Sequence, residues 1–233
     1  MMDDLNIYVG YDSKEDIAYR VCKYSILKRS SNKNLKVTSL KLYELVTNKM
    51  YSRDIDPLAS TEFTYSRFLV PALNKYKGWA IFCDCDFIFF EDVSKILENL
   101  DDSKAVYCVK HDYTPKEKHK MDGQKQTIYP RKNWSSFILF NCSHPSNTNL
   151  SIELVNSESG SFLHQFKWLK DSEIGTLDER WNWLEGWTSN HNKNKPFAVH
   201  YTRGGPWFDE WQDVEFAKEW INERDEYLKN KFI

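Results

Sequence analysis

The sequence predicts an α/β fold in which helices flank a mixed, mainly parallel β-sheet. Short apolar runs typical of buried strands alternate with stretches that have helical periodicity along most of the chain. The first three elements read as strand, helix and strand, the order of a parallel βαβ unit. No internal repeat or low-complexity linker divides the 233 residues, so we expect a single domain spanning 1–233.

The chain opens with the β-type run LNIYVGYD, which Gly10 closes. Asp12 and Glu15, three residues apart, form a helix-start signature before the amphipathic stretch Ile17–Leu27. The segment LKVTSLKL, residues 35–42, alternates with period two and predicts the second strand. A parallel pair of strands joined by a helix is therefore expected at the start of the fold.

The middle of the chain continues the alternation. TEFTYSRFLVPALNKY, residues 61–76, predicts a helix that Pro71 kinks or divides, which places Arg67 on a helix just before the next strand. That strand is WAIFC, and it leads into DCDFIFF. The remaining expected elements are the helix EDVSKILENL and the strands AVYCVKH, SSFILFN and KPFAVHY.

Two polar or charged segments lie outside this alternation. Residues 111–133 are too long for a simple connector, so we expect either a solvated surface loop or an acceptor-side flap. Residues 209–231 predict a closing C-terminal helix, with an Asp209/Gln212 cap pattern. Its expected apolar stripe consists of Val214, Ala217, Ile221 and Leu228.

The composition excludes several classes of protein. The formal charge of −2 comes from 32 basic and 34 acidic side chains, so no global field attracts nucleic acid. No stretch approaches the roughly 20 apolar residues of a spanning helix, which leaves at most peripheral membrane contact. Five thinly spread cysteines and no secretory signal before Leu5 favour reduced thiols and a cytoplasmic setting. Aromatic residues make up 15% of the chain, which suits either sugar-stacking surfaces or a large core.

Two carboxylates lie within the apolar run WAIFCDCDFIFF, which is predicted to be buried and where burial makes a charged side chain unfavourable. On a strand, Asp84 and Asp86 would project to the same side, with Cys83 and Cys85 on the other. Two carboxylates sharing a site repel each other unless a cation lies between them, and oxygen ligands favour Mg²⁺ or Mn²⁺ over zinc. The alternative is a strand end at which the carboxylates cap the next helix or pair with arginine.

A second polar cluster follows the last expected strand. AVHYTRGGPWF places His200 at the strand's end, before Arg203 and the pair Gly204 and Gly205. Such a turn can bring backbone N–H groups and a cation against phosphate. A lone histidine can be structural, but as a nitrogen ligand it would favour Mn²⁺ over Mg²⁺. A metal held by Asp84, Asp86 and His200 would stabilise a departing diphosphate, the requirement of glycosyl transfer from a nucleotide sugar.

The order of these motifs resembles that of glycosyltransferase family 8, which includes glycogenin and bacterial lipopolysaccharide galactosyl- and glucosyltransferases. The matching segments are VGYD, YSRFLVPAL, WAIFCDCDFIFFEDV, SSFILFN and VHYTRGGPW, and together they cover roughly Leu5 to Phe208. The resemblance implies a GT-A (Rossmann-like) fold, a UDP-sugar donor, a divalent metal, a glycan or lipid-linked acceptor, and retention of anomeric configuration.

The resemblance also implies roles for individual residues. Tyr11 and Asp12 would touch the nucleobase, Arg67 the ribose or sugar side of the donor, and Asp84, Asp86 and His200 the metal. Arg203, Gly204 and Gly205 would line the diphosphate, although the family's late lysine before the PW pair is absent, because Gly205 precedes Pro206. Ser135 and Ser136 stand where the family commonly has alanine and glycine, which leaves the donor sugar open.

The segment IGTLDERWNWLEGW resembles the family region that holds an acidic or amide residue beside the anomeric carbon. Asp178 is the first candidate for this residue and Glu179 the second. If the transfer instead inverts the anomeric configuration, Asp178 is the first candidate for the base that takes the proton of the acceptor hydroxyl. Trp181, Trp183 and Trp187 could stack on an acceptor or pack in the core.

The expected function is thus metal-dependent hexosyl transfer. Two alternatives stay open. A sugar nucleotidyltransferase would also place an acidic metal site in an α/β sheet, but it needs a glycine-rich, basic N-terminal loop, and VGYDSKED is acidic. A non-catalytic carbohydrate-binding protein could use the tryptophan-rich C-terminal third without metal.

Overall fold

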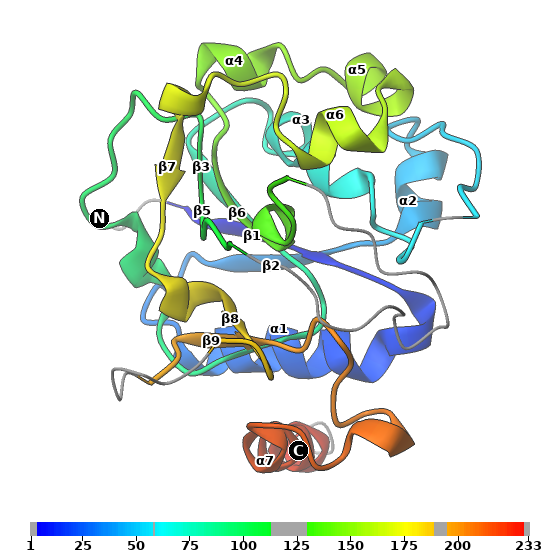
Figure 1. Ribbon diagram of the computed structural model, residues 1–233, viewed down its shortest axis with the longest axis vertical. Coiled ribbons are helices and arrows are strands. Elements are labelled where there is room, and N and C mark those ends of the chain that lie inside the picture. The colour runs from blue at the N-terminus through cyan, green and yellow to red at the C-terminus, as the bar shows by residue number, and fades with distance from the viewer. Residues whose placement is uncertain (1–3, 58, 113–129, 189–194, 231–233) are drawn as a thin grey trace.

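The chain folds around two β-sheets of unequal size, shown in the computed structural model of Figure 1. The structure describes residues 4–57, 59–112, 130–188 and 195–230. In these residues the larger sheet has six strands in the order β2-β1-β3-β6-β5-β7, and the smaller has three in the order β4-β9-β8. The strands are β1 (Asn6–Gly10), β2 (Lys36–Leu40), β3 (Trp79–Cys83), β4 (Phe87–Phe89), β5 (Val106–Cys108), β6 (Phe137–Asn141), β7 (Ile174–Thr176), β8 (Trp183–Leu184) and β9 (Ala198–His200).

Helices lie on both sides of the larger sheet, with α1 on one side and α3 to α6 towards the other (Figure 1). Their bounds are α1 (Asp16–Arg29), α2 (Leu42–Thr47), α3 (Val70–Leu73), α4 (Pro145–Thr148), α5 (Ile152–Ser157), α6 (Gly160–His164) and α7 (Ala217–Asn230). The last helix packs outside α1, where Arg29 forms an ion pair with Glu223 at 2.8 Å. The predicted α/β class is confirmed, and so is the opening unit, because β1 and β2 pair in parallel around α1.

One strand makes the larger sheet mixed. β1 pairs in parallel with β2 and β3, and β5 pairs in parallel with β7, but β6 runs antiparallel to both β3 and β5. The beginning of β6 therefore lies beside the end of β3, with Phe137 opposite Cys83. As a result, the Asp84 backbone N–H donates to the carbonyl of Ser136 at 2.9 Å.

The smaller sheet joins the segment after Asp86 to the C-terminal part of the chain. β4 pairs antiparallel with β9, so Phe87 lies opposite His200, and β8 pairs in parallel with β9 on its other edge. The Tyr201 N–H also donates to the Asp86 carbonyl at 3.0 Å. This pairing places the end of β9 next to the acidic turn.

The core explains the continuous apolar runs of the sequence. Every residue of β6 is buried, and β1 and β3 are each buried after their first residue, as expected of strands covered on both faces. All five cysteines are buried, with free thiols. Trp181 and Trp183 are buried as well, at 5% and 2% exposure, so both pack in the core.

Two expected helices are largely replaced by tighter turns. In the segment 61–76, a 3-10 helix covers Ser66–Leu69 and α3 follows it directly. Pro71 lies in the first turn of α3, where its missing N–H would have no helical partner. Of the two expected effects, it therefore divides the segment into two short helices and does not kink a longer one. The expected helix after Phe90 is a 3-10 helix, Val93–Leu97, capped by Asp92, which accepts from Ser94 N–H.

The expected bounds of two other elements are wrong. The strand predicted over 35–42 ends at Leu40, because α2 begins at Leu42. The C-terminal helix begins at Ala217 instead of 209, after a 3-10 turn at Asp209–Trp211. Phe216 has φ 61°, a left-handed conformation that interrupts a helix.

The buried face of α7 also differs from the expected stripe. Ala217, Trp220 and Glu223 are its buried residues, whereas Leu228 is 38% exposed. Glu223 is buried because Arg29 neutralises it. Of the expected loop 111–133, residues 113–129 lie outside the described residues. Within the part of the chain that is described, no helix combines the length and apolarity needed to cross a bilayer.

Candidate functional site

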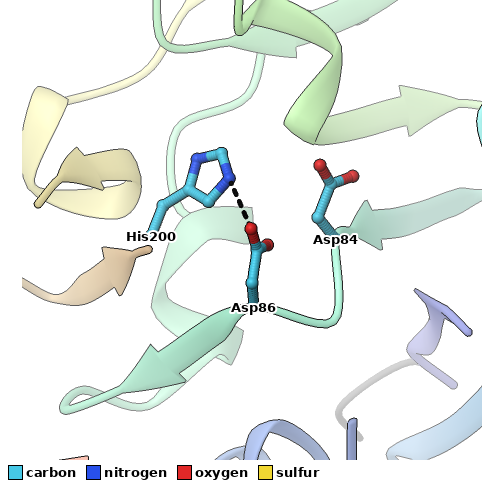
Figure 2. A group of neighbouring side chains, drawn as sticks. All are labelled: Asp84, Asp86 and His200. Atoms are coloured by element: carbon cyan, nitrogen blue, oxygen red, sulfur yellow. Dashed lines mark ion pairs between the residues drawn. The ribbon is translucent and has the colours of Figure 1, made fainter. Parts of the chain in front are cut away.

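Three side chains converge where the two sheets meet. Asp84, Asp86 and His200 each offer one ligand atom, and these atoms all lie within 4.8 Å of one another (Figure 2). The two aspartates lie in the turn between β3 and β4, so the expectation that they project from one face of a strand is wrong. They converge because this turn connects β3 of the larger sheet to β4 of the smaller one, which pairs with β9. The predicted grouping of two carboxylates with His200 is nevertheless present.

The polar atoms of this group fit a divalent cation. Asp86 Oδ2 lies 3.3 Å from His200 Nε2, and Asp86 Oδ1 is buried with no hydrogen-bond partner in the described structure. A buried carboxylate oxygen without a donor is costly, and a cation is one group that satisfies it. Two carboxylates and one imidazole are ligands that Mn²⁺ or Mg²⁺ accepts, and the imidazole favours Mn²⁺. Asp84, Asp86 and His200 would hold the ion.

Arg67 holds Asp84 in place. Its Nη1 lies 2.8 Å from Asp84 Oδ1 and donates to the Ser135 carbonyl at 2.8 Å. The guanidinium is buried over the rings of Phe63 and Phe82, with its central carbon 5.2 and 4.9 Å from their centroids. The alternative in which an aspartate pairs with arginine therefore holds for Asp84, although Asp84 also belongs to the group with Asp86 and His200.

His200 is fixed from two directions. Its ring stacks on Phe87 with centroids 4.4 Å apart and planes 14° apart. Its Nδ1 lies 3.0 Å from Asn182 Oδ1, at the end of a 3-10 helix (Glu179–Asn182) that leads into β8. Asn182 is fully buried, and the sequence reasoning missed it. A polar residue between two tryptophans in the buried run WNW was the signal that could have identified it.

The residues after β1 lie at the same sheet edge. β1 and β3 are parallel, with Val9 opposite Cys83, so Tyr11 and Asp12 follow β1 where Asp84 follows β3. Asp12 is buried; its Oδ1 accepts from Lys14 N–H and its Oδ2 from Glu62 N–H. Tyr11 donates its hydroxyl to Asp16 Oδ1 at 3.0 Å. These bonds shape the turn expected to meet a nucleobase.

Glu15 adds a fourth carboxylate to this edge. Burial raises its pKa to about 8, and the nearby charges of Asp86 and Asp12 act in the same direction. The Cys85 thiol lies 3.7 Å from its Oε2. The sequence reasoning used Glu15 only as a helix-start residue, because the approach of α1 to the acidic turn is a tertiary feature.

His111, at the start of the expected acceptor-side loop, lies within electrostatic reach of the group. Burial, together with the nearby His200, lowers its pKa to about 3. Its Nε2 is buried with no hydrogen-bond partner in the described part of the chain. His111 is therefore neutral at physiological pH.

Ser135 and Ser136 precede β6 and lie beside the acidic turn. The Ser135 hydroxyl lies 2.8 Å from His164 Nδ1. The Ser136 hydroxyl donates to the Asn133 carbonyl at 2.7 Å and accepts from Asn182 Nδ2 at 2.9 Å. Both serines therefore take part in hydrogen-bond networks that surround the carboxylate and histidine group.

The turn after His200 depends on glycine and on a buried ion pair. Arg203 Nη2 lies 2.9 Å from Oε2 of Glu185, which is 2% exposed. Gly204 has φ 135°, and a Cβ at Gly205 would overlap the Trp207 ring. Arg203 is thus held by Glu185, a buried partner that the sequence reasoning did not identify.

Asp178 and Glu179 begin the 3-10 helix that ends at Asn182. Asp178 caps it by accepting from Arg180 N–H at 3.0 Å, and it pairs with the Arg180 guanidinium at 2.6 Å. The Arg180 side chain lowers the pKa of Asp178. The two candidate catalytic acids therefore lie on the same short helix as Asn182, the partner of His200.

Comparison with solved structures places this fold among the glycosyltransferases. The bifunctional glycosyltransferase WbbM matches 96% of this chain and 50% of its own, with a TM-score of 0.69 and 15% identity. The glycosyltransferase GlyE of Streptococcus pneumoniae matches at a TM-score of 0.63 and 13% identity, over 99% of this chain and 63% of its own. The chain thus spans less than two thirds of either relative. The galactosyltransferase LgtC, solved with donor and acceptor sugar analogues, matches over 95% of both chains, with a TM-score of 0.58 and 11% identity.

These similarities confirm the GT-A fold that the family 8 resemblance implies. No family model matches the chain. A curated sequence, protein CDI of Arabidopsis thaliana, is 53% identical over 230 residues, which cover 96% of this chain and 87% of the relative. The chain therefore belongs to the same family as Arabidopsis protein CDI and has the fold of the GT-A glycosyltransferases.

Proposed function

We propose that the protein is a metal-dependent glycosyltransferase that moves a hexose from a UDP-sugar to a glycan or lipid-linked acceptor with retention of configuration. The observation that carries this proposal is the convergence of Asp84, Asp86 and His200 at the carboxyl edge of a GT-A sheet. A bound Mn²⁺ or Mg²⁺ would supply charge stabilisation for the leaving diphosphate.

The chain's own residues would share the remaining work. Tyr11 and Asp12 lie at the edge where a nucleoside would bind, and Arg67 holds Asp84 in position. Arg203, Gly204 and Gly205 would line the diphosphate through the guanidinium and the backbone N–H groups of this turn, with Glu185 holding Arg203 in place. Asp178, followed by Glu179, is the candidate to act beside the anomeric carbon.

The donor sugar would lie near the residues that surround β6. Ser135 and Ser136 replace the smaller residues common in the resembling family, so their hydroxyls are proposed to contact the sugar. In a retaining transfer the departing phosphate oxygen can take the proton of the acceptor hydroxyl. No dedicated base is then required on the chain.

The test is release of UDP from a panel of UDP-sugars with Mn²⁺, together with calorimetric binding of Mn²⁺ and UDP. Asp86→Asn should abolish both signals, whereas Asp171→Asn, at an exposed acid paired with Arg131, should leave both intact. Pyrophosphate release would instead identify a sugar nucleotidyltransferase. Binding of a glycan without turnover of any UDP-sugar would identify a carbohydrate-binding protein.

A further inference from the structure

The orientation of the Asn182 amide is fixed by its two neighbours. Its Nδ2 lies 3.4 Å from the Asn133 carbonyl, an atom that can only accept. It also lies 2.9 Å from Ser136 Oγ, whose single hydrogen is already donated to the same Asn133 carbonyl. Both neighbours therefore require the NH₂ group on this side, and the amide oxygen must point the other way.

That oxygen decides where His200 carries its proton. Asn182 Oδ1 lies 3.0 Å from His200 Nδ1, and a carbonyl oxygen cannot donate. The hydrogen of this bond must therefore be on Nδ1. Neutral imidazole has one N–H, so Nε2 is left with a lone pair.

The lone pair points to the carboxylates. His200 Nε2 is the atom that lies 3.3 Å from Asp86 Oδ2, and the ring is fixed by its stacking on Phe87 and by burial at 2% exposure. A ring flip would break the bond to Asn182 and expose an N–H to the ion. The Asn182 bond therefore selects the form of His200 that can bind a metal.

The turn that orients Asn182 also contacts the other ligand. Asn133–Ser136 supplies the carbonyl and hydroxyl that hold the amide, and the Ser136 carbonyl accepts from Asp84 N–H at 2.9 Å. The Ser135 carbonyl holds Arg67, which pairs with Asp84. One short turn therefore connects both sides of the group.

We infer that Asn182 is a positioning residue that fixes the Nδ1–H tautomer of His200 and thereby presents Nε2 to a divalent cation. For the neutral ring, the tautomer follows from the hydrogen bonds. The cation part rests on the proposed function. Residues that orient a ligating histidine typically change metal affinity about 10- to 100-fold when replaced.

The test uses the full-length protein with ¹⁵N-labelled histidine and long-range NMR correlation, which reports the protonated ring nitrogen. His200 is assigned among the six histidines by the signal that His200→Gln removes. Without metal, at about pH 8 where imidazole is ordinarily neutral, wild type should show the Nδ1–H form. Asn182→Leu should lose this preference, and its Mn²⁺ affinity, measured by EPR of the metal alone, should fall about 10- to 100-fold.

Two further variants separate positioning from folding. Asn182→Asp keeps an acceptor for Nδ1–H, and its second oxygen can accept the Ser136 hydroxyl hydrogen in place of the lost NH₂ bonds. It should therefore retain both the tautomer and Mn²⁺ binding, even if Asn182→Leu fails to fold. Asn147→Leu removes another fully buried amide, which bonds to Trp168 and the Ala105 carbonyl, and should lower stability only. The inference is overturned if Asn182→Leu keeps the wild-type tautomer and affinity, or if Asn182→Asp loses the tautomer. If wild type binds no Mn²⁺, the proposed function fails, and the NMR result still decides the role of Asn182.

Discussion

Arg67 and Asp84 form an ion pair at 2.8 Å in which both side chains are largely withdrawn from water, with exposures of 7% and 15%. The same guanidinium nitrogen donates to the Ser135 carbonyl, so one arginine joins the acidic turn to the segment before β6. Loss of one partner from such a pair leaves the other charge in a poorly solvated place. Arg67 is therefore expected to matter for folding as well as for donor binding.

Replacing Arg67 by Met should lower the free energy of unfolding by about 3 kcal/mol, the lower end of the cost of breaking a buried ion pair. Urea denaturation measures this change. Arg224→Met is the matched control, because Arg224 and Asp225 form a pair that is 33% and 48% exposed, and exposed pairs contribute about 1 kcal/mol or less. Equal losses in the two variants would show that the Arg67 pair is no stronger than a surface pair.

Asp178→Asn tests the candidate catalytic acid. If Asp178 acts beside the anomeric carbon, turnover of the UDP-sugar should fall about 100-fold or more, as for other groups that act on the reacting atoms. Binding of Mn²⁺ and UDP should be unchanged, because the proposed metal ligands are other residues. The same measurements on Glu179→Gln rank the two acids. Full turnover in Asp178→Asn would remove that residue from the catalytic set.

Glu15 should make stability depend on pH in metal-free protein. Its pKa of about 8 in the fold exceeds the ordinary value of 4.5, so the folded state holds this proton more tightly than the unfolded state. The stabilisation is complete below about pH 4.5 and is lost as pH rises through 8. In EDTA, Glu15→Gln should flatten the fall in unfolding free energy across this window.

An exposed glutamate provides the control for that experiment. The pKa of Glu153 is lowered by its backbone N–H at the start of α5 and by Ser151. Its contribution is therefore present at neutral pH and lost on acidification, the opposite sign from Glu15. Glu153→Gln should leave the slope between neutral pH and pH 8 unchanged. A Glu15→Gln profile parallel to wild type would contradict the raised pKa.

Two glycines separate backbone strain from steric overlap. Gly186 and Gly78 have φ values of 66° and 58°, so alanine at either position costs about 1–2 kcal/mol of left-handed strain. A Cβ at Gly186 would also overlap the Arg203 guanidinium, whereas nothing lies within 4 Å of a Cβ at Gly78. Gly186→Ala should therefore lower the unfolding midpoint clearly more than Gly78→Ala, as thermal denaturation would show. Equal shifts would mean that Arg203 can move away from Glu185 without cost.

Local patterns in the sequence predicted the α/β class, the opening βαβ unit and the association of Asp84, Asp86 and His200. Each of these depends on periodicity or on the position of a residue at a strand end. The antiparallel direction of β6 was not predictable in this way, because strand direction depends on which neighbours pair. That direction places Ser136 beside Asp84.

The residues that were missed act through tertiary contacts. Asn182 and Glu185 carry no recognisable spacing, and their roles arise only when β8 pairs with β9 beside His200. The start of α7 was placed too early because a good helical pattern at 209–216 is interrupted by the left-handed Phe216. The role of Glu15 likewise depends on where α1 brings it. Pattern analysis therefore identified the candidate metal ligands but not the residues that hold them in place.

The pairing of Phe87 with His200 brings together candidate metal ligands that are far apart along the chain. In the unfolded chain these ligands are dispersed, so an ion held by all three would bind the folded state almost exclusively. Folding and ion binding would then be thermodynamically linked, and the unfolding midpoint would rise with Mn²⁺ concentration. A truncated chain that stops before β9 would lose this response, since it keeps both aspartates but lacks the strand that completes the ligand set.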